Sequence, residues 1–576
     1  MTAAAFRDLA GMALRNLARH KVKTIITTIA VAISVALYIF MDAWLLGMNL
    51  DSRRNIVSYE IGAAKVQKAA YFDKKDELPM YESFGGWEEL AAALAAAGYD
   101  SAPRFVFTGT LYSRSGTAPI VFNAVDVERE AKLLRYPAYL ESGRFPAAGK
   151  REIAIGTFAA EKLRVGIPTR PTRDEFEDDL LAAAATAEDA AFVRSLYGPP
   201  PPPKKQAFSN PDPALRSLAA EKLALKEGAT AAELDRLWRI LSESGRMDVR
   251  IATTIDLKAA PEIIRKEKFE GELLAKLEGS ARERLRAAYA ADEITGDYRL
   301  VAVDEAEVAA VLADLLAIDF SGAVRHVNQL VDAVVVGVVN SPNPKTNGNV
   351  AFLPLDALQD ESGLMLQGAA TELLVRKAGA DDARLPGRDE SAEAIEAALA
   401  SRLGGKLPEG LVVRPWIDYV SDYLAAAAGD NVSSRVMIFF LFVLSFIGIA
   451  NTMLMAILER TKETGMLRAL GMTDGQVLLA YVLEAACIGA LGSAVGIVAG
   501  CLMNIPMVEH GIDYSAMSKE LGGDFGYRIT AFFRSAWNPP AIALTGVFAT
   551  LLSAAAAILP TRRALKMPVT DSLRFE

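Results

Sequence analysis

Four long apolar runs dominate the hydrophobic pattern, one near the start of the chain and three near its end. The first, 24–48, is long enough to cross the roughly 30 Å hydrocarbon layer of a bilayer as a helix. It is also too long for the apolar core of a signal peptide. The others cover 436–457, 477–503 and 540–559, each between charged or proline-containing flanks. This pattern predicts an α-helical membrane protein with four transmembrane helices, the first being an uncleaved anchor.

The segment 50–430, between the first and second runs, has a different pattern. Strand-like and helix-like stretches alternate along it, and residues 332–339 (DAVVVGVV) and 371–377 (TELLVRK) have the composition of strands. We therefore expect one large α+β domain inserted between the first two transmembrane helices.

Residues 169–330 of that domain are rich in Ala, Glu, Lys and Arg, and we expect charged helices there. One helix is well marked, because Thr230 and Glu233 form a capping box and Gly245 supplies a stop. Its apolar face consists of Leu234, Leu237, Trp238 and Leu241. The proline run 199–203 is expected to be a stiff linker, with a recognition motif for a partner as the alternative.

Composition agrees with a chain divided between lipid and water. Of 576 residues, 52% are hydrophobic and 23% are charged. The net charge of −9 lacks the basic footprint of a nucleic-acid-binding protein, so that class of partner is set aside. The two cysteines, Cys487 and Cys501, share one apolar run, so we expect packed side chains and neither a disulfide nor a metal site.

The positions of Lys and Arg predict the orientation in the membrane. Basic residues gather before the first run, between the second and third, and after the fourth: Arg7, Arg15, Arg19, Lys21, Lys23, Arg460, Lys462, Arg468, Arg562, Arg563 and Lys566. These flanks, including 1–23 and 560–576 at the two termini, are expected in the cytoplasm, with 50–430 and the loop 504–538 outside. Residues 1–23 are interpreted as an amphipathic helix on the inner surface, or as an extension of the first span.

No catalytic motif is present in the sequence. It has no G-x-x-x-x-G-K-[ST] loop, no G-x-S-x-G elbow and no H-E-x-x-H pair, and its three histidines, His20, His326 and His510, are far apart. We therefore expect a chain that is not an enzyme and holds no cofactor or metal, and any ATPase would have to be a partner chain.

Ionisable residues are sparse within the apolar runs. Glu484 in the third run and Asp42 near the outer end of the first are the candidates. So few charges argue against an ion channel or a proton relay. We expect Glu484 to reach the surface or to pair with a nearby Arg.

A dense motif, ERTKETGMLRALGM at 459–472, directly follows the second run. It resembles the signature of FtsX-like ABC transporter permeases, in which an E-R-x-x-E-I-G-x-L-R-A-L-G stretch follows an Asn-containing span. The matching residues are Glu459, Arg460, Glu463, Gly465, Leu467, Arg468, Ala469, Leu470 and Gly471. Thr464 departs from the family's usual Ile. The two ends of the chain also resemble the family, as do the internal segments 139–167 and 333–359. Residues 169–330 would then be an insertion.

The resemblance implies the permease subunit of an ABC transporter in the bacterial inner membrane. Residues 459–472 would form the coupling helix that contacts a cytoplasmic ABC ATPase dimer, its apolar side carrying Met466, Leu467, Leu470 and Met472. A second permease copy or a paralogue would complete the complex, and ATP-driven closure would move the outer domain. That domain's size and the lack of a fused ATPase favour the lipoprotein-releasing type (LolC/LolE) over the cell-division type, with a periplasmic acceptor for the load.

Several alternatives remain open at this stage. A permease of the MacB type would export macrolides or peptides, a non-transport adaptor would activate a cell-wall hydrolase, and a membrane sensor would need no ATPase.

Gly492, Gly496 and Gly500 repeat a small residue at every fourth position, which predicts close approach of another helix from the same chain or from a second permease. The 169–330 insertion is either a partner-binding arm or a surface elaboration.

Overall fold

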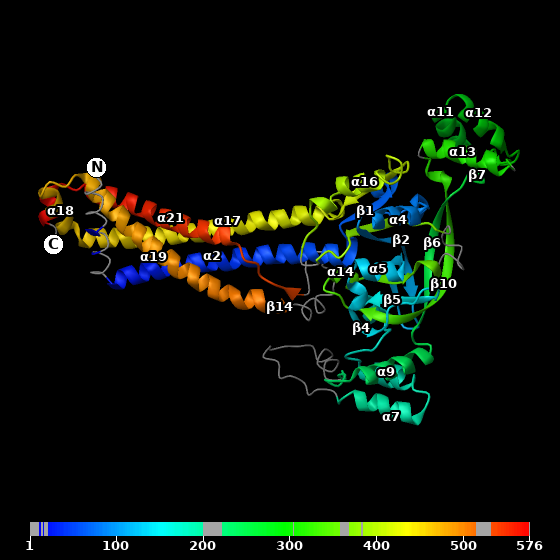
Figure 1. The fold of residues 1–576 in the computed structure, drawn as a ribbon, viewed down its shortest axis with the longest axis horizontal. Coiled ribbons are helices and arrows are strands. Elements are labelled where there is room, and N and C mark those ends of the chain that lie inside the picture. The colour runs from blue at the N-terminus through cyan, green and yellow to red at the C-terminus, as the bar shows by residue number, and fades with distance from the viewer. Residues whose placement is uncertain are drawn as a thin grey trace. The chain divides into compact units, whose positions relative to one another are not determined.

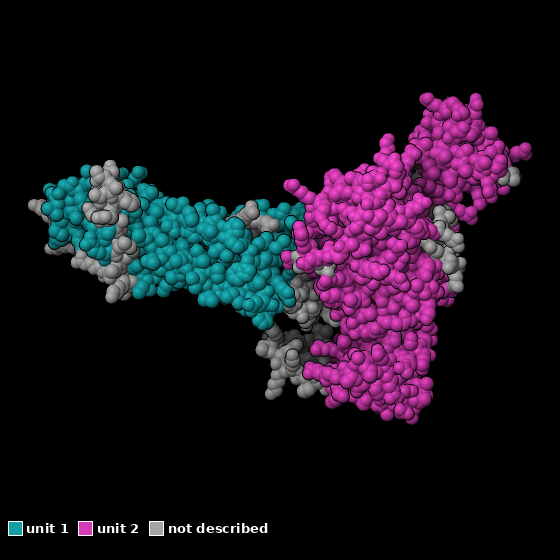
Figure 2. Space-filling view, viewed as in Figure 1, with its two compact units in different colours: residues 1–53, 420–518, 530–576 teal, residues 54–419, 519–529 magenta. Residues whose placement is uncertain are grey.

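The computed structural model describes residues 11–12, 15, 21–199, 222–302, 304–318, 320–357, 368–381, 384–513 and 532–574. The chain forms two compact units (Figure 2). Unit 1 comprises residues 1–53, 420–518 and 530–576, and unit 2 comprises residues 54–419 and 519–529. Unit 2 thus begins and ends within a dozen residues of the boundaries expected for the α+β domain.

Unit 1 is built from four long helices that run side by side (Figure 1). They are α2 (Lys21–Ile56), α17 (Ser421–Glu459), α19 (Asp474–Glu509) and α21 (Pro539–Leu565). Helix α21 packs against both α17 and α19. Their shared core contains Val35, Ile39, Ile488, Ala549 and Ala556, all buried.

Within the described residues, three helices are long and apolar enough to cross a membrane: Thr24–Ile61, Asp474–Glu509 and Pro539–Leu565. They contain the predicted first, third and fourth runs. The second run lies inside α17, where the apolar stretch found among the described residues is the shorter Phe446–Glu459. The structure therefore confirms three apolar helices beside a β-rich unit, and the fourth span stays a prediction.

The helices extend beyond the runs that predicted them. Helix α17 starts at Ser421, because polar residues such as Asp422 and Asn431 end an apolar pattern without ending a helix. Helix α19 continues through Pro506, so the expectation of a loop from 504 is wrong for its first residues. Beyond it, β14 (Ile512–Asp513) pairs with β15 (Phe532–Phe533), and 514–531 lie outside the described residues. The expected amphipathic helix also falls largely outside them.

Unit 2 contains a ten-stranded sheet and confirms the mixed α and β character. Its strands are β1 (Ala64–Lys68), β2 (Tyr99–Tyr112), β3 (Thr117–Val125), β4 (Leu140–Gly143), β5 (Glu152–Gly156), β6 (Asp248–Lys258), β10 (Val324–Val339), β11 (Val350–Pro354), β12 (Glu372–Lys377) and β13 (Leu411–Pro415). The strands expected from DAVVVGVV and TELLVRK are β10 and β12. The order is β13-β1-β12-β2-β3-β11-β5-β10-β4, and β6 pairs with both β10 and β2. The strands β2, β3, β11, β5, β10 and β6 therefore form a closed circuit.

The two faces of this sheet differ along β2, because successive side chains point to opposite faces. Phe105 and Phe107 lie on one face, where Phe107 stacks on Phe122 of β3 at 5.0 Å between ring centroids. Arg104 and Val106 lie on the other, the polar face. Helices α4 (Trp87–Ala96) and α16 (Ala392–Ala400) cover the apolar face near β1, β12 and β13.

Shorter helices connect the strands. They are α3 (Ala69–Asp73), α5 (Val127–Leu133), α6 (Thr157–Leu163) and α14 (Pro344–Asn347). Helix α5 packs against β2. Its N-cap is Asp126, whose side chain accepts a hydrogen bond from the Arg129 amide.

The stretch 169–330 is not one helical insertion but two lobes separated by a strand. The first lobe holds α7 (Ala187–Leu196) and α9 (Ala231–Glu243), and the capping box of Thr230 and Glu233 is confirmed at the start of α9. Of the proline run 199–203, residues 200–203 lie outside the described residues.

The second lobe sits at the tip of a long hairpin of β6 and β10 (Figure 1). It contains β7 (Ile263–Ile264), α10 (Lys266–Lys268), α11 (Leu274–Lys276), α12 (Gly279–Ala288), β8 (Tyr289–Ala291), β9 (Tyr298–Leu300) and α13 (Glu305–Ala317). The helical expectation is wrong for β6 and for the first residues of β10. The alternation in DVRIATTIDLK at 248–258 has the period of a strand and marks β6.

Candidate functional site

The motif at 459–472 forms a helical corner in unit 1. Helix α17 ends at Glu459, and after Arg460 the short helix α18 (Thr461–Ala469) begins. Gly471 has a φ of +101°, a backbone conformation that favours glycine, and it turns the chain out of α18. Thr473 and Gln476 then form a capping box that starts α19.

Arg460 holds three helices together at this corner. Its Nε lies 3.1 Å from Oε2 of Glu463 on α18, and its Nη1 lies 3.4 Å from Oε2 of Glu484 on α19. Arg460 and Glu484 are both buried. A buried charge needs an opposite charge beside it, so the pairing expected for Glu484 is present, with Arg460 as its partner.

Two further motif residues also face inward. The hydroxyl of Thr464 lies 2.8 Å from that of Tyr481 on α19, so this departure from the family's Ile has a polar partner that the sequence did not reveal. Arg468 donates from Nη1 to the Met567 carbonyl at 2.8 Å, and its Nε lies 2.9 Å from Asp474. The polar motif residues therefore fix α18 in place. Helix α18 also packs against α22 (Val569–Arg574).

The outward side of α18 carries Lys462, Met466 and Ala469, and the exposed Leu470 follows directly after the helix. Met466 is 50% exposed and Leu470 is 85% exposed, and residues four apart share one side of a helix. Leu467 is half-buried. Met472 packs against Ile457, Val477 and Tyr481, so the expectation that it belongs to the exposed apolar side is wrong. The arrangement is suited to contact with another protein and offers no catalytic group.

The three glycines of α19 face α2 of the same chain. A Cβ at Gly492 would lie 2.7 Å from Cβ of Val31, and one at Gly496 would lie 2.6 Å from the Ala32 carbonyl oxygen. At Gly500 the Ala36 carbonyl oxygen is 3.0 Å away. The small-residue repeat therefore lets α2 and α19 approach closely, which answers the question of which helix they contact.

Among the described residues, no group of three or more His, Cys, Asp or Glu is placed to hold a metal ion. Cys487 and Cys501 are both free.

Comparison with known proteins identifies this part of the chain. The family described as "FtsX-like permease C-terminal" matches residues 435–569, a range that includes the whole corner. This segment is FtsX-like. The match confirms the resemblance drawn from the motif, and the FtsX-like segment contains α18, α19, α21 and the whole predicted second span.

Two curated relatives place the FtsX-like segment among ABC permeases. The macrolide export ATP-binding/permease protein MacB of Chromobacterium violaceum is 25% identical over 258 residues, which is 43% of this chain and 34% of that protein. The ABC transporter permease YtrF of Bacillus subtilis is 29% identical over 145 residues, 23% of this chain and 30% of that protein. The chain spans about a third of the length of the curated relatives it matches.

Proposed function

We propose that the chain is the permease subunit of an ABC transporter and that α18 docks onto a cytoplasmic ATPase. The exposed pair Met466 and Leu470 carries this proposal. Arg460, Glu463 and Arg468 make their contacts inside unit 1, so the exposed apolar pair is left as the contact surface for a groove on the partner.

The proposed partner is an ABC ATPase dimer on separate chains, which would bind ATP and Mg²⁺. This agrees with the missing phosphate-binding loop in this sequence and with ABC permeases as relatives. Two permease chains, identical or paralogous, would complete the complex in the inner membrane. The basic flanks favour cytoplasmic termini and a unit 2 on the outer side.

In this proposal ATP-driven movement of α18 is transmitted to unit 2. The load we favour is a lipoprotein released to a periplasmic acceptor, because unit 2 is large. A second candidate is efflux of macrolides or peptides. It is favoured by the match to MacB, whose 258 aligned residues extend beyond the FtsX-like segment.

The test is affinity purification of the tagged full-length protein from its native membrane, followed by identification of the chains that accompany it. The double variant Met466→Asp/Leu470→Asp should lose the ATPase, because two carboxylates would face the apolar groove. Lys462→Gln is the matched control, since Lys462 is exposed one turn before Met466 and its change tests whether charge on that side, rather than the apolar pair, carries the binding. Reversing Glu463 or Arg468 would be less informative, because both contribute to the fold of the corner.

An ATPase bound by the wild type and the Lys462 variant but lost from the double variant supports the proposal. If no ATPase accompanies the wild type under gentle conditions, the proposal fails in favour of a membrane sensor. Binding of a cell-wall hydrolase to the protein would indicate the adaptor. Trapped lipoproteins or exported drugs would decide between the two loads.

A further inference from the structure

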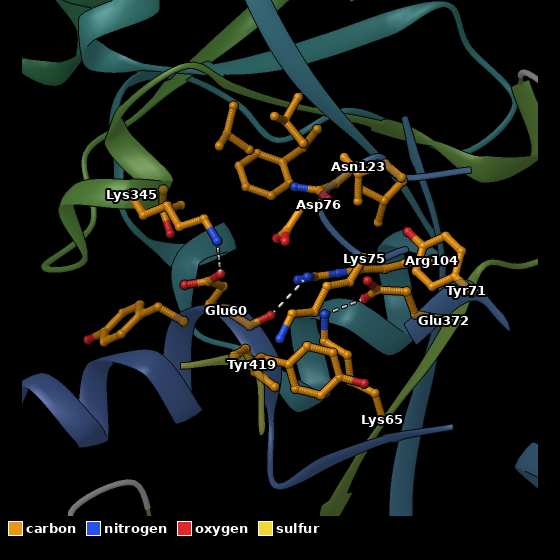
Figure 3. Close-up of a pocket in the computed structure, with 18 residues that line it drawn as sticks. Glu60, Lys65, Tyr71, Lys75, Asp76, Arg104, Asn123, Lys345, Glu372 and Tyr419 are labelled. Atoms are coloured by element: carbon orange, nitrogen blue, oxygen red, sulfur yellow. Dashed lines mark hydrogen bonds and ion pairs between the residues drawn. The ribbon is translucent and has the colours of Figure 1, made fainter. Parts of the chain in front are cut away.

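The strongest unassigned feature is a cavity of about 250 Å³ on the polar face of the sheet in unit 2 (Figure 3). Its floor is formed by β1, β12, β2, β3 and β11 side by side. Tyr59, Glu60 and Ile61 line one wall, from the π-helical turn Val57–Ile61 that follows α2. Tyr419 and the segment 75–78 complete the lining.

The buried cations of this cavity are already neutralised. Lys65 of β1 lies 2.5 Å from Glu372 of β12, and both side chains are less than 10% exposed. Arg104 of β2 is ion-paired with Glu130. Burial lowers the pKa of the Lys65 ammonium, and the attraction of Glu372 opposes that shift. An anion entering here would have to displace a carboxylate from each of these cations.

Lys345, another cation in the lining, is also paired with a carboxylate. Nη1 of Arg104 donates to the Glu60 carbonyl at 2.8 Å, while the Glu60 carboxylate lies 2.5 Å from Nζ of Lys345. The turn carrying Glu60 is therefore held at two points. These contacts shape the cavity and occupy the charges of Arg104, Glu60 and Lys345.

Two charged groups remain, Lys75 and Asp76. Among the described residues, neither has an ion-pair partner within 4 Å, and the Lys75 ammonium donates only to the Asp418 carbonyl, at 3.0 Å. Figure 3 shows the Asp76 carboxylate pointing into the cavity between Lys345 and Arg104, with Asn123 beside it. The Lys75 ammonium also lies 5.0 Å from the centroid of the Phe72 ring, so its contacts are with uncharged groups. The cavity thus offers one cation and one anion without oppositely charged partners among the described residues.

Part of the cavity lining is apolar. Val106, Val121, Val350 and Phe352 line it, from β2, β3 and β11. The hydroxyl of Tyr419 is buried without a hydrogen-bond partner among the described residues, and its ring lies 4.7 Å from Nζ of Lys65. The cavity therefore combines two opposite charges with an apolar part of its lining.

We propose that this cavity binds a small zwitterion with an apolar side chain, namely an α-amino acid or a dipeptide. Its ammonium would pair with Asp76, its carboxylate with Lys75, and its side chain would lie against Val106, Val121 and Phe352. The volume lies below the roughly 300–1,000 Å³ of pockets for drug-sized ligands, which fits this class and excludes a macrolide. The inference does not depend on the ATPase proposal.

Isothermal titration calorimetry of the purified full-length protein in nanodiscs tests it, with L-leucine and L-alanyl-L-leucine as probes. N-acetyl-L-leucine lacks the ammonium and L-leucinamide lacks the carboxylate, so both should bind at least about tenfold more weakly than the better zwitterion. Asp76→Asn should abolish the preference for the zwitterion over N-acetyl-L-leucine. Lys75→Met should abolish the preference for the zwitterion over L-leucinamide. Asp73→Asn and Lys74→Met, on the same segment, are matched controls that should leave binding unchanged.

The variants change residues at the edge of the cavity, so the buried pairs stay intact, and circular dichroism checks that each variant is folded. Discrimination lost with Asp76→Asn and Lys75→Met but kept in the two controls supports the proposal. It is overturned if neither zwitterion binds at up to about 10 mM, a limit of about 3 kcal/mol in affinity. Equal binding of N-acetyl-L-leucine and L-leucine to the wild type overturns it as well, in favour of an anion site.

Discussion

The corner around α18 in unit 1 and the cavity in unit 2 use buried ion pairs in the same way and differ in what they leave uncovered. At the corner, Arg460 with Glu484 fixes three helices, and the groups left outside are the apolar Met466 and Leu470. In unit 2, Lys65 with Glu372 and Arg104 with Glu130 fix the polar face of the sheet. There the groups left over are charged. In both regions the buried ion pairs serve as scaffolding, and both proposed contacts use groups that have no ion-pair partner.

This difference has a consequence for the two proposed contacts. An apolar pair on a convex helix suits a protein groove, whereas two opposite charges at a small cavity suit a small polar molecule. Breaking the scaffold and altering the unpaired groups should therefore give different results. The scaffold variants should lower stability, and the others should lower binding alone.

The largest loss is expected in unit 2. Arg104→Leu leaves the carboxylate of Glu130, which is fully buried, without its cation, and this should lower the free energy of unfolding by roughly 3–5 kcal/mol. Chemical unfolding of the full-length protein followed by tryptophan fluorescence measures it. Arg144→Leu is the control, because Arg144 is 53% exposed in its pair with Glu152 and should cost less than about 1 kcal/mol. Equal losses would show that burial of the pair is not what matters.

A smaller loss is expected from the corresponding change at the corner. Glu484→Gln leaves Arg460 with the partly exposed Glu463, so the expected cost is about 2–3 kcal/mol, within the range for hydrogen bonds to charged groups. Thermal unfolding in detergent measures it. Asp474→Asn is the control, since Asp474 is 62% exposed beside Arg468. A loss as large as that of Arg104→Leu would mean that Glu463 gives no compensation.

The glycine repeat should be sensitive to a single methyl group. Gly496→Ala places a Cβ about 2.6 Å from the Ala32 carbonyl oxygen, so α2 and α19 must separate, at a cost of about 1–2 kcal/mol. In Gly448→Ala of α17, the new Cβ meets no described atom within 4 Å, and stability should not fall. Thermal unfolding of both variants makes the comparison. If both variants lost the same stability, close helix approach would not explain the repeat.

The sequence predicted unit 1 better than unit 2 because apolar runs and a dense local motif carry their signal in consecutive residues. It located the motif helix, the glycine repeat and the pairing of Glu484. It did not reveal the lining of the cavity above the sheet. Distant segments must fold over the sheet before their residues come together there, among them Glu60, Asp76, Lys345 and Tyr419. It also placed β6 in a helical insertion, because an Ala-, Lys- and Glu-rich context obscured an eleven-residue strand.

The smallest effect is expected at Thr464, whose hydrogen bond with Tyr481 is an uncharged contact beside the buried ion pairs of the corner. Thr464→Val and Tyr481→Phe each remove one side of a 2.8 Å hydrogen bond, and the double variant removes both. A double-mutant cycle by thermal unfolding should give a coupling energy of about 1 kcal/mol, well below that of the buried ion pairs. The control cycle combines Thr464→Val with Tyr38→Phe on α2 and should give no coupling. A coupling near zero for Thr464 and Tyr481 would mean that Thr464 serves only as a small packed side chain in place of the family's Ile.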